Sequence, residues 1–179
     1  SVLWWASDFK SSCYIYREFN MPNLTLAQAA KAVIENSFNE DILYVCASPD
    51  LWARRQERGV SGAEIMYECG LANLVKANND RINGWNVTRE FLRLRQDEYG
   101  NESAFIKIVE NACPVLCDSM ARLQFSKRNP NDADTQPHDA THATDALRYG
   151  AMSLPFYKRE EKCDAWLDKE TDEGFYFWD

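Results

Sequence analysis

The sequence predicts an α/β protein in which helices cover a mixed β-sheet. Three observations support this prediction. Strand-like and helix-like hydrophobic periods alternate along the chain, two capping-box patterns begin helices, and one continuous apolar run is typical of a buried strand. The chain has 179 residues, of which 45% are hydrophobic and 13% aromatic, so it can bury the core of a single domain.

The N-terminal segment is expected to form a β-hairpin. Residues 1–6 are apolar and aromatic, residues 12–19 alternate around three aromatic side chains, and the segment 7–11 between them is typical of a turn. A Met-Pro-Asn sequence then ends the strand pattern. The Thr-x-x-Gln capping box that follows predicts an alanine-rich helix over residues 25–36.

The middle of the chain is expected to supply the central strand of the sheet. Residues 42–47 form a continuous apolar run, which predicts a strand buried on both faces. A Ser-x-x-Glu capping box predicts a short helix over 61–70, a strand follows over 73–77, and a longer helix over 80–96. The inner face of that longer helix is expected to carry Ile82, Trp85, Phe91 and Leu92.

The last third of the chain continues the alternation of strand and helix. Residues 104–109 predict a strand, and Asn111 is expected to cap a helix that has Pro114 near its first turn and ends near residue 125. The polar, proline-containing segment 127–137 predicts a loop, and residues 139–153 predict a helix. We therefore expect one domain over residues 1–155 and a separate acidic, aromatic tail over 156–179.

The charge of the chain restricts its possible function. Lys and Arg number 20 and Asp and Glu number 28, giving a net charge of −8. This acidity argues against a protein that coats DNA non-specifically, but it does not exclude a nuclease, which needs clustered carboxylates. Residues 50–95 are the exception, with 8 basic and 6 acidic side chains. Any nucleic-acid surface is therefore expected in this segment.

The cysteines favour buried free thiols in a cytosolic protein. The chain has 6 cysteines, none in a Cys-x-x-Cys pair, and most lie in apolar segments. Cys113 and Cys117 are close on an expected helix, but no His lies near them in sequence, which disfavours a zinc site. No apolar run approaches the roughly 20 residues that span a membrane, and the sequence shows no signal peptide.

The expected helix over 139–153 carries the sharpest candidate site. Asp139, His142 and Asp145 are spaced by three residues and therefore share one helical face. Such a face could bind a divalent cation, because hard cations take carboxylate oxygens. The alternative is a solvated polar face on which Asp139 acts as the helix N-cap.

Two further candidate sites lie in the middle segment. Asp50 follows the predicted central strand, where ligands gather in α/β sheets, although Ser-Pro-Asp can equally be only a turn. Lys76, Asn79 and Arg81 follow a strand and begin a helix, which suits phosphate binding or an ordinary helix N-terminus. The candidate DNA-binding residues are Lys76, Asn79, Arg81, Arg54 and Arg55.

These segments occur together in an order that resembles a known family. The chain over residues 1–153 resembles the C-terminal nuclease domain of the large terminase subunit of tailed bacteriophages. The matching motifs are Tyr14-Ile-Tyr-Arg-Glu-Phe19, Ser48-Pro-Asp-Leu-Trp52, Gly59 to Glu64, Asn79-Asp-Arg-Ile-Asn-Gly-Trp85, Asn129-Pro-Asn-Asp132 and His142-Ala-Thr-Asp-Ala-Leu-Arg-Tyr149. The last is close to the family's His-Ala-x-Asp-Ala-x-Arg-Tyr helix and is the most specific.

The resemblance implies an RNase H-like fold and a metal-dependent endonuclease that cuts concatemeric viral double-stranded DNA during packaging. It implies two Mg²⁺ or Mn²⁺ ions held by carboxylates. Mapped residue by residue, Asp50, Asp145 and His142 would be catalytic, and Asp50, Asp145, Asp139 and Glu18 would be metal ligands. The implied partners are the ATPase domain of the same subunit, the portal protein and the small terminase subunit, in the cytoplasm of a bacterial host.

The chain departs from the family pattern in two places. The family's first catalytic Asp lies at the start of its first strand, whereas Ser1-Val2-Leu3-Trp4 resembles the later part of that strand, so this Asp is expected upstream of the sequence. The family often has Asp-Pro after the third strand, whereas this chain has Ser48-Pro49 with the carboxylate one residue later. No Gly-Lys dipeptide occurs, so no P-loop ATP site is expected.

Three functional classes therefore remain open. The first is a terminase nuclease domain. The second is a catalytically incomplete RNase H-like module that acts in DNA or portal docking. The third is an unrelated α/β binding protein in which all of these acids are surface residues.

Overall fold

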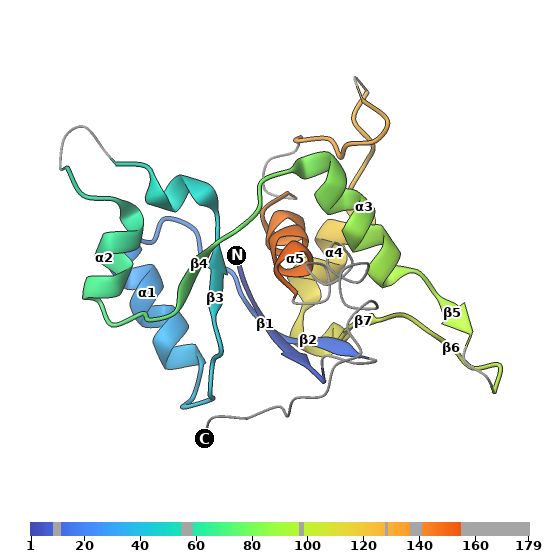
Figure 1. Cartoon of the computed structure of the whole chain (residues 1–179), viewed down its shortest axis with the longest axis horizontal. Helices are drawn as coiled ribbons and strands as arrows, with labels where there is room; N and C mark the ends of the chain where they lie inside the picture. The colour runs from blue at the N-terminus through green and yellow to red at the C-terminus, as the bar shows by residue number, and fades with distance from the viewer. Residues whose placement is uncertain (9–11, 55–58, 97–98, 128, 137–140, 155–179) are drawn as a thin grey trace, which may run out of the picture.

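The computed structural model describes residues 1–8, 12–54, 59–96, 99–127, 129–136 and 141–154. Over these residues the chain is a mixed α/β protein, as predicted, with five helices and small mixed sheets (Figure 1). The helices are α1 (Leu26–Asn36), α2 (Gly62–Glu68), α3 (Arg81–Leu92), α4 (Pro114–Arg122) and α5 (Thr141–Ser153). Among the described helices, none is long and apolar enough to cross a membrane. The expected tail over 156–179 lies outside the described residues.

The strands are short, and the described residues also contain two 3₁₀ turns. The strands are β1 (Val2–Ser7), β2 (Cys13–Phe19), β3 (Val45–Ala47), β4 (Leu74–Lys76), β5 (Arg95–Gln96), β6 (Glu102–Ser103) and β7 (Ile106–Ile108). The 3₁₀ turns are η1 (Pro49–Trp52) and η2 (Glu110–Ala112). The sequence predicted all of these strands except β5 and β6.

The first sheet contains the predicted hairpin. β1 and β2 pair antiparallel, with a register shift between Trp4 and Trp5. β2 also pairs in parallel with β7, so the strand order is β1-β2-β7 and β2 is the middle strand. This sheet therefore joins the N-terminal hairpin to a strand from the second half of the chain.

The second sheet corrects the prediction for residues 42–47. Only Val45–Ala47 is a strand, its three residues are half-buried, and β4 is its one partner among the described strands. The prediction of a central strand buried on both faces is therefore wrong. The physical reason is that all three residues of β3 border a cavity, so part of the apolar surface of the strand is uncovered.

Both predicted capping boxes are present. The Thr25 side chain accepts a hydrogen bond from the Gln28 amide at the start of α1, and Ser61 accepts one from the Glu64 amide at the start of α2. In each case the third residue of the helix bonds back to the cap. These two helix starts are fixed by local sequence alone.

Three predictions for the later helices are wrong. α3 ends at Leu92 rather than near Gln96, and Ile82 on this helix is 43% exposed, whereas Trp85 is buried. Asn111 lies in η2 and does not cap α4. Instead Glu18 of β2 accepts hydrogen bonds from the amides at the start of α4, at 2.7 Å from Val115 and 2.9 Å from Leu116.

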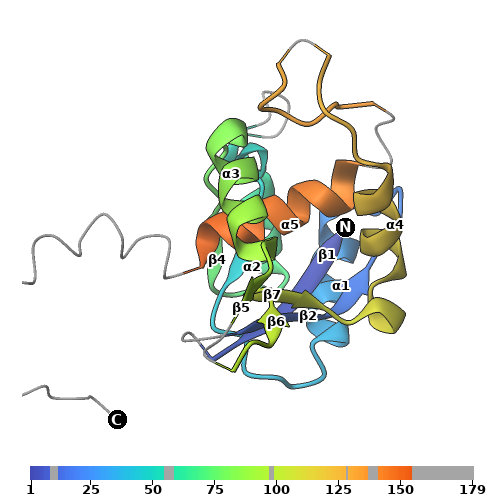
Figure 2. The same cartoon turned by 90° about the vertical axis from the view of Figure 1, so that its right-hand side faces the viewer.

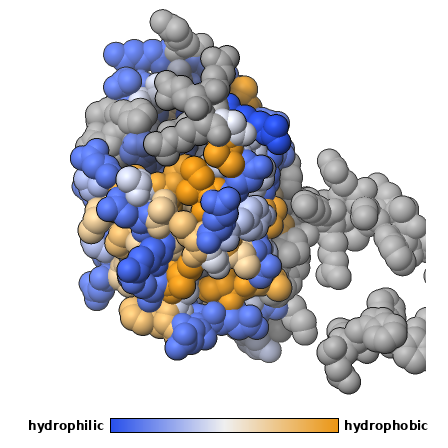
Figure 3. Space-filling model, turned by 90° about the vertical axis from the view of Figure 1, so that its left-hand side faces the viewer, coloured by the Kyte–Doolittle hydropathy of each residue, from blue (hydrophilic) through white to orange (hydrophobic). Residues whose placement is uncertain are grey.

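Two hydrophobic cores lie on opposite faces of β1, with α1 and α2 on one side of the strands and α3 to α5 on the other (Figures 1 and 2). The α5 core consists of Cys13, Ile15, Val87, Ile106, Cys113, Leu116, Ala143, Leu147, Ala151, Met152 and Leu154. The α1 core consists of Trp4, Ala30, Val33, Leu71 and Leu74. Figure 3 shows apolar side chains gathered between charged ones on the outer side formed by α1 and α2.

The prediction of free, buried thiols is confirmed for two cysteines. Cys13 and Cys113 are fully buried, and burial raises the pKa of each thiol to about 11. Cys69 is exposed, so the prediction is wrong there. Cys46 and Cys117 are free and half-buried, and Cys163 lies outside the described residues.

Candidate functional site

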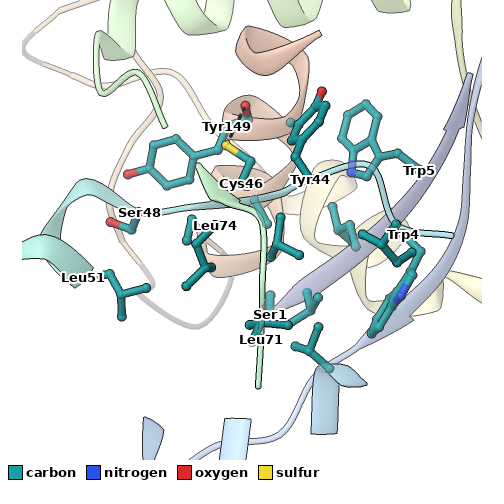
Figure 4. A pocket seen from close by; sticks show the side chains of 18 of the residues that line it. Ser1, Trp4, Trp5, Tyr44, Cys46, Ser48, Leu51, Leu71, Leu74 and Tyr149 are labelled. Atoms are coloured by element: carbon teal, nitrogen blue, oxygen red, sulfur yellow. Dashed lines mark hydrogen bonds between the residues drawn. The ribbon is translucent and has the colours of Figure 1, made fainter. Parts of the chain in front are cut away.

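A cavity of about 990 Å³ lies between β1, β3 and α5 (Figure 4). Its wall includes residues 1–7 along β1 and residues 40–48 before and along β3. Three of the predicted catalytic residues, Asp50, His142 and Asp145, also line it. The structure thus brings to one cavity side chains that the sequence placed on two separate segments.

Asp50 is positioned by the end of β3. It lies in η1, where Pro49 begins the 3₁₀ turn and the Leu51 amide donates to the Ser48 carbonyl at 3.0 Å. The Asp50 side chain is exposed. Because β3 and β4 are parallel, their carboxyl ends meet at one edge, which is where ligand sites of α/β proteins gather.

Asp145 is held by two arginines. Its Oδ1 atom accepts from Arg81 Nη1 at 3.3 Å and from Arg148 Nη2 at 3.1 Å and Nε at 3.2 Å. Both arginines therefore bind the same carboxylate oxygen. A cation at Asp145 would have to bind through Oδ2 or displace an arginine.

Arg81 links three of the segments in the terminase-like motifs. Besides Asp145, it pairs with Asp132 at 3.2 Å and donates to the Ala133 carbonyl at 3.3 Å. A second link joins α5 to the segment before α3, because the Tyr149 hydroxyl donates to Asn79 Oδ1 at 3.1 Å. The segments 79–85, 129–132 and 142–149 therefore meet in one polar network.

Arg148 anchors this network from within the protein. It is 1% exposed, and its guanidinium lies 5.9 Å from the Trp85 ring and 4.4 Å from the Tyr149 ring. Its Nη1 atom has no hydrogen-bond partner among the described residues. A side chain at Gly84 would lie 2.8 Å from Arg148 Cγ, so glycine is needed for α3 and α5 to pack this closely.

The candidate DNA-binding residues do not all lie on one exposed surface. Lys76 and Arg54 are exposed, whereas Arg81 is engaged by two carboxylates and Asn79 by Tyr149. Arg55 lies outside the described residues. Of the five, the structure therefore leaves Lys76 and Arg54 as exposed cations available to a phosphate backbone.

The remaining predicted metal ligands lie elsewhere. Glu18 is bound at the start of α4 and is not part of the cavity wall, and Asp139 lies outside the described residues. Within the described part of the chain, no three His, Cys, Asp or Glu side chains come together as a metal-binding group. Asp50 and Asp145 alone do not fit a two-metal site, which needs further anionic oxygens.

Three titratable groups in the cavity wall are partly buried away from water. Burial raises the pKa of the Tyr44 hydroxyl and of the Cys46 thiol, both on the wall beside β3. Burial also lowers the pKa of the Ser1 α-amino group on the opposite wall. In each case the uncharged form is favoured, as expected where water is excluded.

Sequence reasoning missed the roles of Asp132, Arg148 and Tyr149. Arg148 follows Asp145 by three residues on the same helical face, so its ion pair could have been found from spacing. Nothing in the sequence indicates that Arg81 would reach Asp132, because the two residues are distant along the chain. In comparisons with family models, curated proteins and solved structures, nothing matches this chain.

Proposed function

We propose that the chain is the nuclease domain of the large terminase subunit of a tailed bacteriophage or prophage, with an RNase H-like arrangement of strands. The observation that carries the proposal is that Asp50, which follows the end of β3, lines a single cavity together with His142 and Asp145. The proposed activity is cleavage of concatemeric double-stranded DNA by phosphodiester hydrolysis with Mg²⁺ or Mn²⁺.

The polar network on α3 and α5 supports the proposal. The motifs that carry the terminase resemblance are separate in sequence, yet Arg81 connects the 79–85 segment to both the 129–132 and the 142–149 segments. A chance collection of short motifs would give no reason for them to meet. Their contact gives the resemblance a physical basis in this chain.

The proposed metal site is incomplete in the described residues. Asp50 and Asp145 would be two of its ligands and His142 a neighbouring side chain, and a further acid would be needed to complete it. Mn²⁺ accepts irregular coordination and imidazole more readily than Mg²⁺. We therefore expect this chain to be weakly active, and more so with Mn²⁺.

The proposed partners follow from the same assignment. They are double-stranded viral DNA, the ATPase domain of the same subunit, the portal protein and the small terminase subunit, in the cytoplasm of a bacterial host. Lys76 and Arg54 are exposed cations that suit contacts with DNA phosphates.

A second candidate function is a non-catalytic RNase H-like module that docks DNA or the portal. The ion pairs of Asp145 favour it, because Arg81 and Arg148 neutralise the carboxylate that a metal would need. In this case the network of Asp145 would serve only to fasten α3 to α5.

Nicking of supercoiled plasmid by the 179-residue chain tests the proposal. We expect slow, sequence-independent nicking with millimolar Mn²⁺ and little or none with Mg²⁺. Asp50→Asn and Asp145→Asn should each abolish it. Asp118→Asn is the matched control, since Asp118 is a 63% exposed acid on α4 that pairs with Arg122.

Two results would overturn the nuclease proposal. One is nicking that survives both Asp50→Asn and Asp145→Asn, which would assign the activity to other residues or to a contaminant. The other is no nicking at all with Mn²⁺, which would favour the docking module. Circular dichroism of each variant shows whether a loss of nicking reflects a loss of fold.

A further inference from the structure

The chain between α4 and α5 forms a short hairpin that is held together by its own hydrogen bonds. Phe125 and Ala133 form an antiparallel bridge, and the Ser126 amide donates to the Asp132 carbonyl at 2.9 Å. We call residues 124–134, apart from residue 128, the arm. Figures 1 and 2 both show the arm projecting beyond α3, α4 and α5. The arm therefore has a defined shape outside the packed helices.

One guanidinium fastens the base of the arm to the candidate site. Arg81 Nε donates to both carboxylate oxygens of Asp132, at 3.2 and 3.3 Å, and Arg81 Nη2 donates to the Ala133 carbonyl at 3.3 Å. Through Nη1 the same side chain donates to Asp145 Oδ1 at 3.3 Å. The arm therefore begins one side chain away from Asp145, so a long ligand bound at Asp145 and passing Arg81 would reach it.

The arm presents an aromatic ring and a cation to solvent. Phe125 is 66% exposed and belongs to neither the α5 core nor the α1 core. Lys127, two residues further along, is also exposed. Neither side chain is used to pack the cores, and both are accessible to a partner.

The charge around the arm differs from that of the whole chain. Residues 119–131 contain three basic side chains and no acidic one, whereas the chain has a net charge of −8. Of the three, Arg122 pairs with Asp118 on α4, whereas Lys127 lies on the arm. The next acid in sequence, Asp132, is paired with Arg81 at 3.2 Å. The exposed part of the arm therefore favours an anionic partner.

An aromatic ring close to a cation suits DNA better than it suits an acidic protein surface or a free anion. A carboxylate or an isolated phosphate would engage Lys127 alone. The backbone of DNA places its phosphates beside grooves that are walled by sugars and base edges, and apolar side chains such as Phe pack or insert there. The two side chains thus match a polyanion that also offers apolar surface.

We propose that the arm contacts double-stranded DNA, with Lys127 at a backbone phosphate and Phe125 against the minor groove, and so holds the duplex beside Asp145. This inference deepens the proposed nuclease function, on which its choice of DNA rests. It assigns the arm to binding of the substrate and not to cleavage, so it can be tested in the absence of cleavage.

Binding of a fluorescently labelled DNA duplex to the 179-residue chain, followed by anisotropy in EDTA, tests the proposal. Phe125→Ala should weaken binding about fivefold or more with an unchanged salt dependence, since contacts between aromatic side chains and bases contribute about this much. Lys127→Gln should weaken binding and also lower the slope of log Kd against log salt concentration by about 0.9, the value for one phosphate contact.

The matched controls are Phe38→Ala and Lys31→Gln. Phe38 is 68% exposed and follows α1, and the side chain of Lys31, on α1, is 76% exposed, so both lie away from the arm. Neither substitution should change the affinity or its salt dependence. Heparin, which is anionic but has no bases, separates charge from groove contact. Lys127→Gln should weaken binding to heparin, whereas Phe125→Ala should not.

The proposal is overturned if the parent chain does not bind the duplex, if the two arm variants bind it as the parent does, or if the control variants lose as much affinity. An equal loss of heparin binding in both arm variants would overturn the contact of Phe125 with the groove. The nuclease proposal fails separately: a chain that binds DNA through the arm but does not nick it keeps this inference. Circular dichroism shows that each variant is folded.

Discussion

The α5 core and the α1 core lie on opposite faces of the same strand, yet they are closed to different degrees. Leu116 and Leu147 of the α5 core are 0% and 1% exposed. Val33 and Leu74 of the α1 core are each 8% exposed and also line the cavity beside β3. The part of the α1 core that borders the cavity is therefore less closed than the centre of the α5 core.

The largest expected effect is on core truncations. Leu147→Ala should lower the free energy of unfolding by about 2–5 kcal/mol, because it leaves a void in a closed core. Leu74→Ala should cost about 2 kcal/mol or less, since its side chain already borders open volume. Urea unfolding of the two variants measures both values. Equal losses would show that the two cores are equally closed.

Substitutions at two glycines test the comparison of the two cores by adding a methyl group instead of removing side-chain atoms. Gly150→Ala should destabilise by about 1 kcal/mol net, because overlap with the rigid Trp5 indole outweighs the better helix propensity of alanine. Gly62→Ala should be neutral to within about 0.5 kcal/mol. Its new methyl group would lie 2.7 Å from Leu51 Cδ1 and 2.9 Å from Leu26 Cδ1, two flexible side-chain ends that also line the cavity and can move. It would also lie 3.2 Å from the Leu51 carbonyl oxygen, a contact that needs a backbone shift of only a few tenths of an ångström.

Thermal unfolding of the two glycine variants gives the comparison directly. A stabilised Gly150→Ala protein would contradict the close packing of β1 on α5. A strongly destabilised Gly62→Ala protein would show instead that the leucine side chains at the cavity are fixed.

A smaller effect on stability is expected from substitutions at the starts of α4 and α2. Glu18→Ala should destabilise by about 1 kcal/mol, because the start of α4 loses an acceptor for two amides and a negative charge at its positive end. Glu18→Gln keeps an acceptor oxygen and should cost less. Glu64→Ala, at the local capping box of α2, should also cost less, because Ser61 still caps that helix. Chemical unfolding that ranks Glu64→Ala above Glu18→Ala would reverse this assignment.

The smallest effect concerns the acid side of the pH range. Hydrogen bonds from Arg17 and Tyr16 lower the pKa of Glu40 below its ordinary value of 4.5. A lowered carboxyl pKa stabilises the fold above pH 4.5, and this contribution is lost as the pH falls through the folded-state pKa. Glu40→Gln should therefore be less stable than the parent chain at pH 7, with the difference disappearing in strong acid. A difference that stays constant with pH would mean that the carboxylate charge is not involved.

Elements fixed by neighbouring residues could be predicted from the sequence. The hairpin of β1 and β2 and the capping boxes of α1 and α2 depend on residues a few positions apart, and each is present. The apolar run at 42–47 was misjudged because hydrophobicity indicates burial but not which neighbour provides it. The sequence could not show that β3 would border a cavity.

In the candidate site, too, local arrangements could be predicted from the sequence and long-range contacts could not. His142 and Asp145 share a helical face, as their spacing predicted, and both line the cavity. The contact of Arg81 with Asp145 spans 64 residues of sequence, and that of Glu18 with Val115 spans 97. Such contacts follow from the arrangement of whole elements, so from the sequence we expected Arg81 at DNA and, through the terminase resemblance, Glu18 at a metal.

The position of α5 has a consequence for how this protein is made. α5 contacts β1, β3, α3 and α4, and it supplies buried residues that no earlier segment replaces. Domains generally fold as units during synthesis, once their last required element is available. Since α5 ends at Ser153, it can pack against β1, β3, α3 and α4 only after nearly all of the described domain has left the ribosome. Until then the hairpin of β1 and β2, which is synthesised before α5, has its Trp5 face uncovered, which makes it a segment for a nascent-chain chaperone to protect.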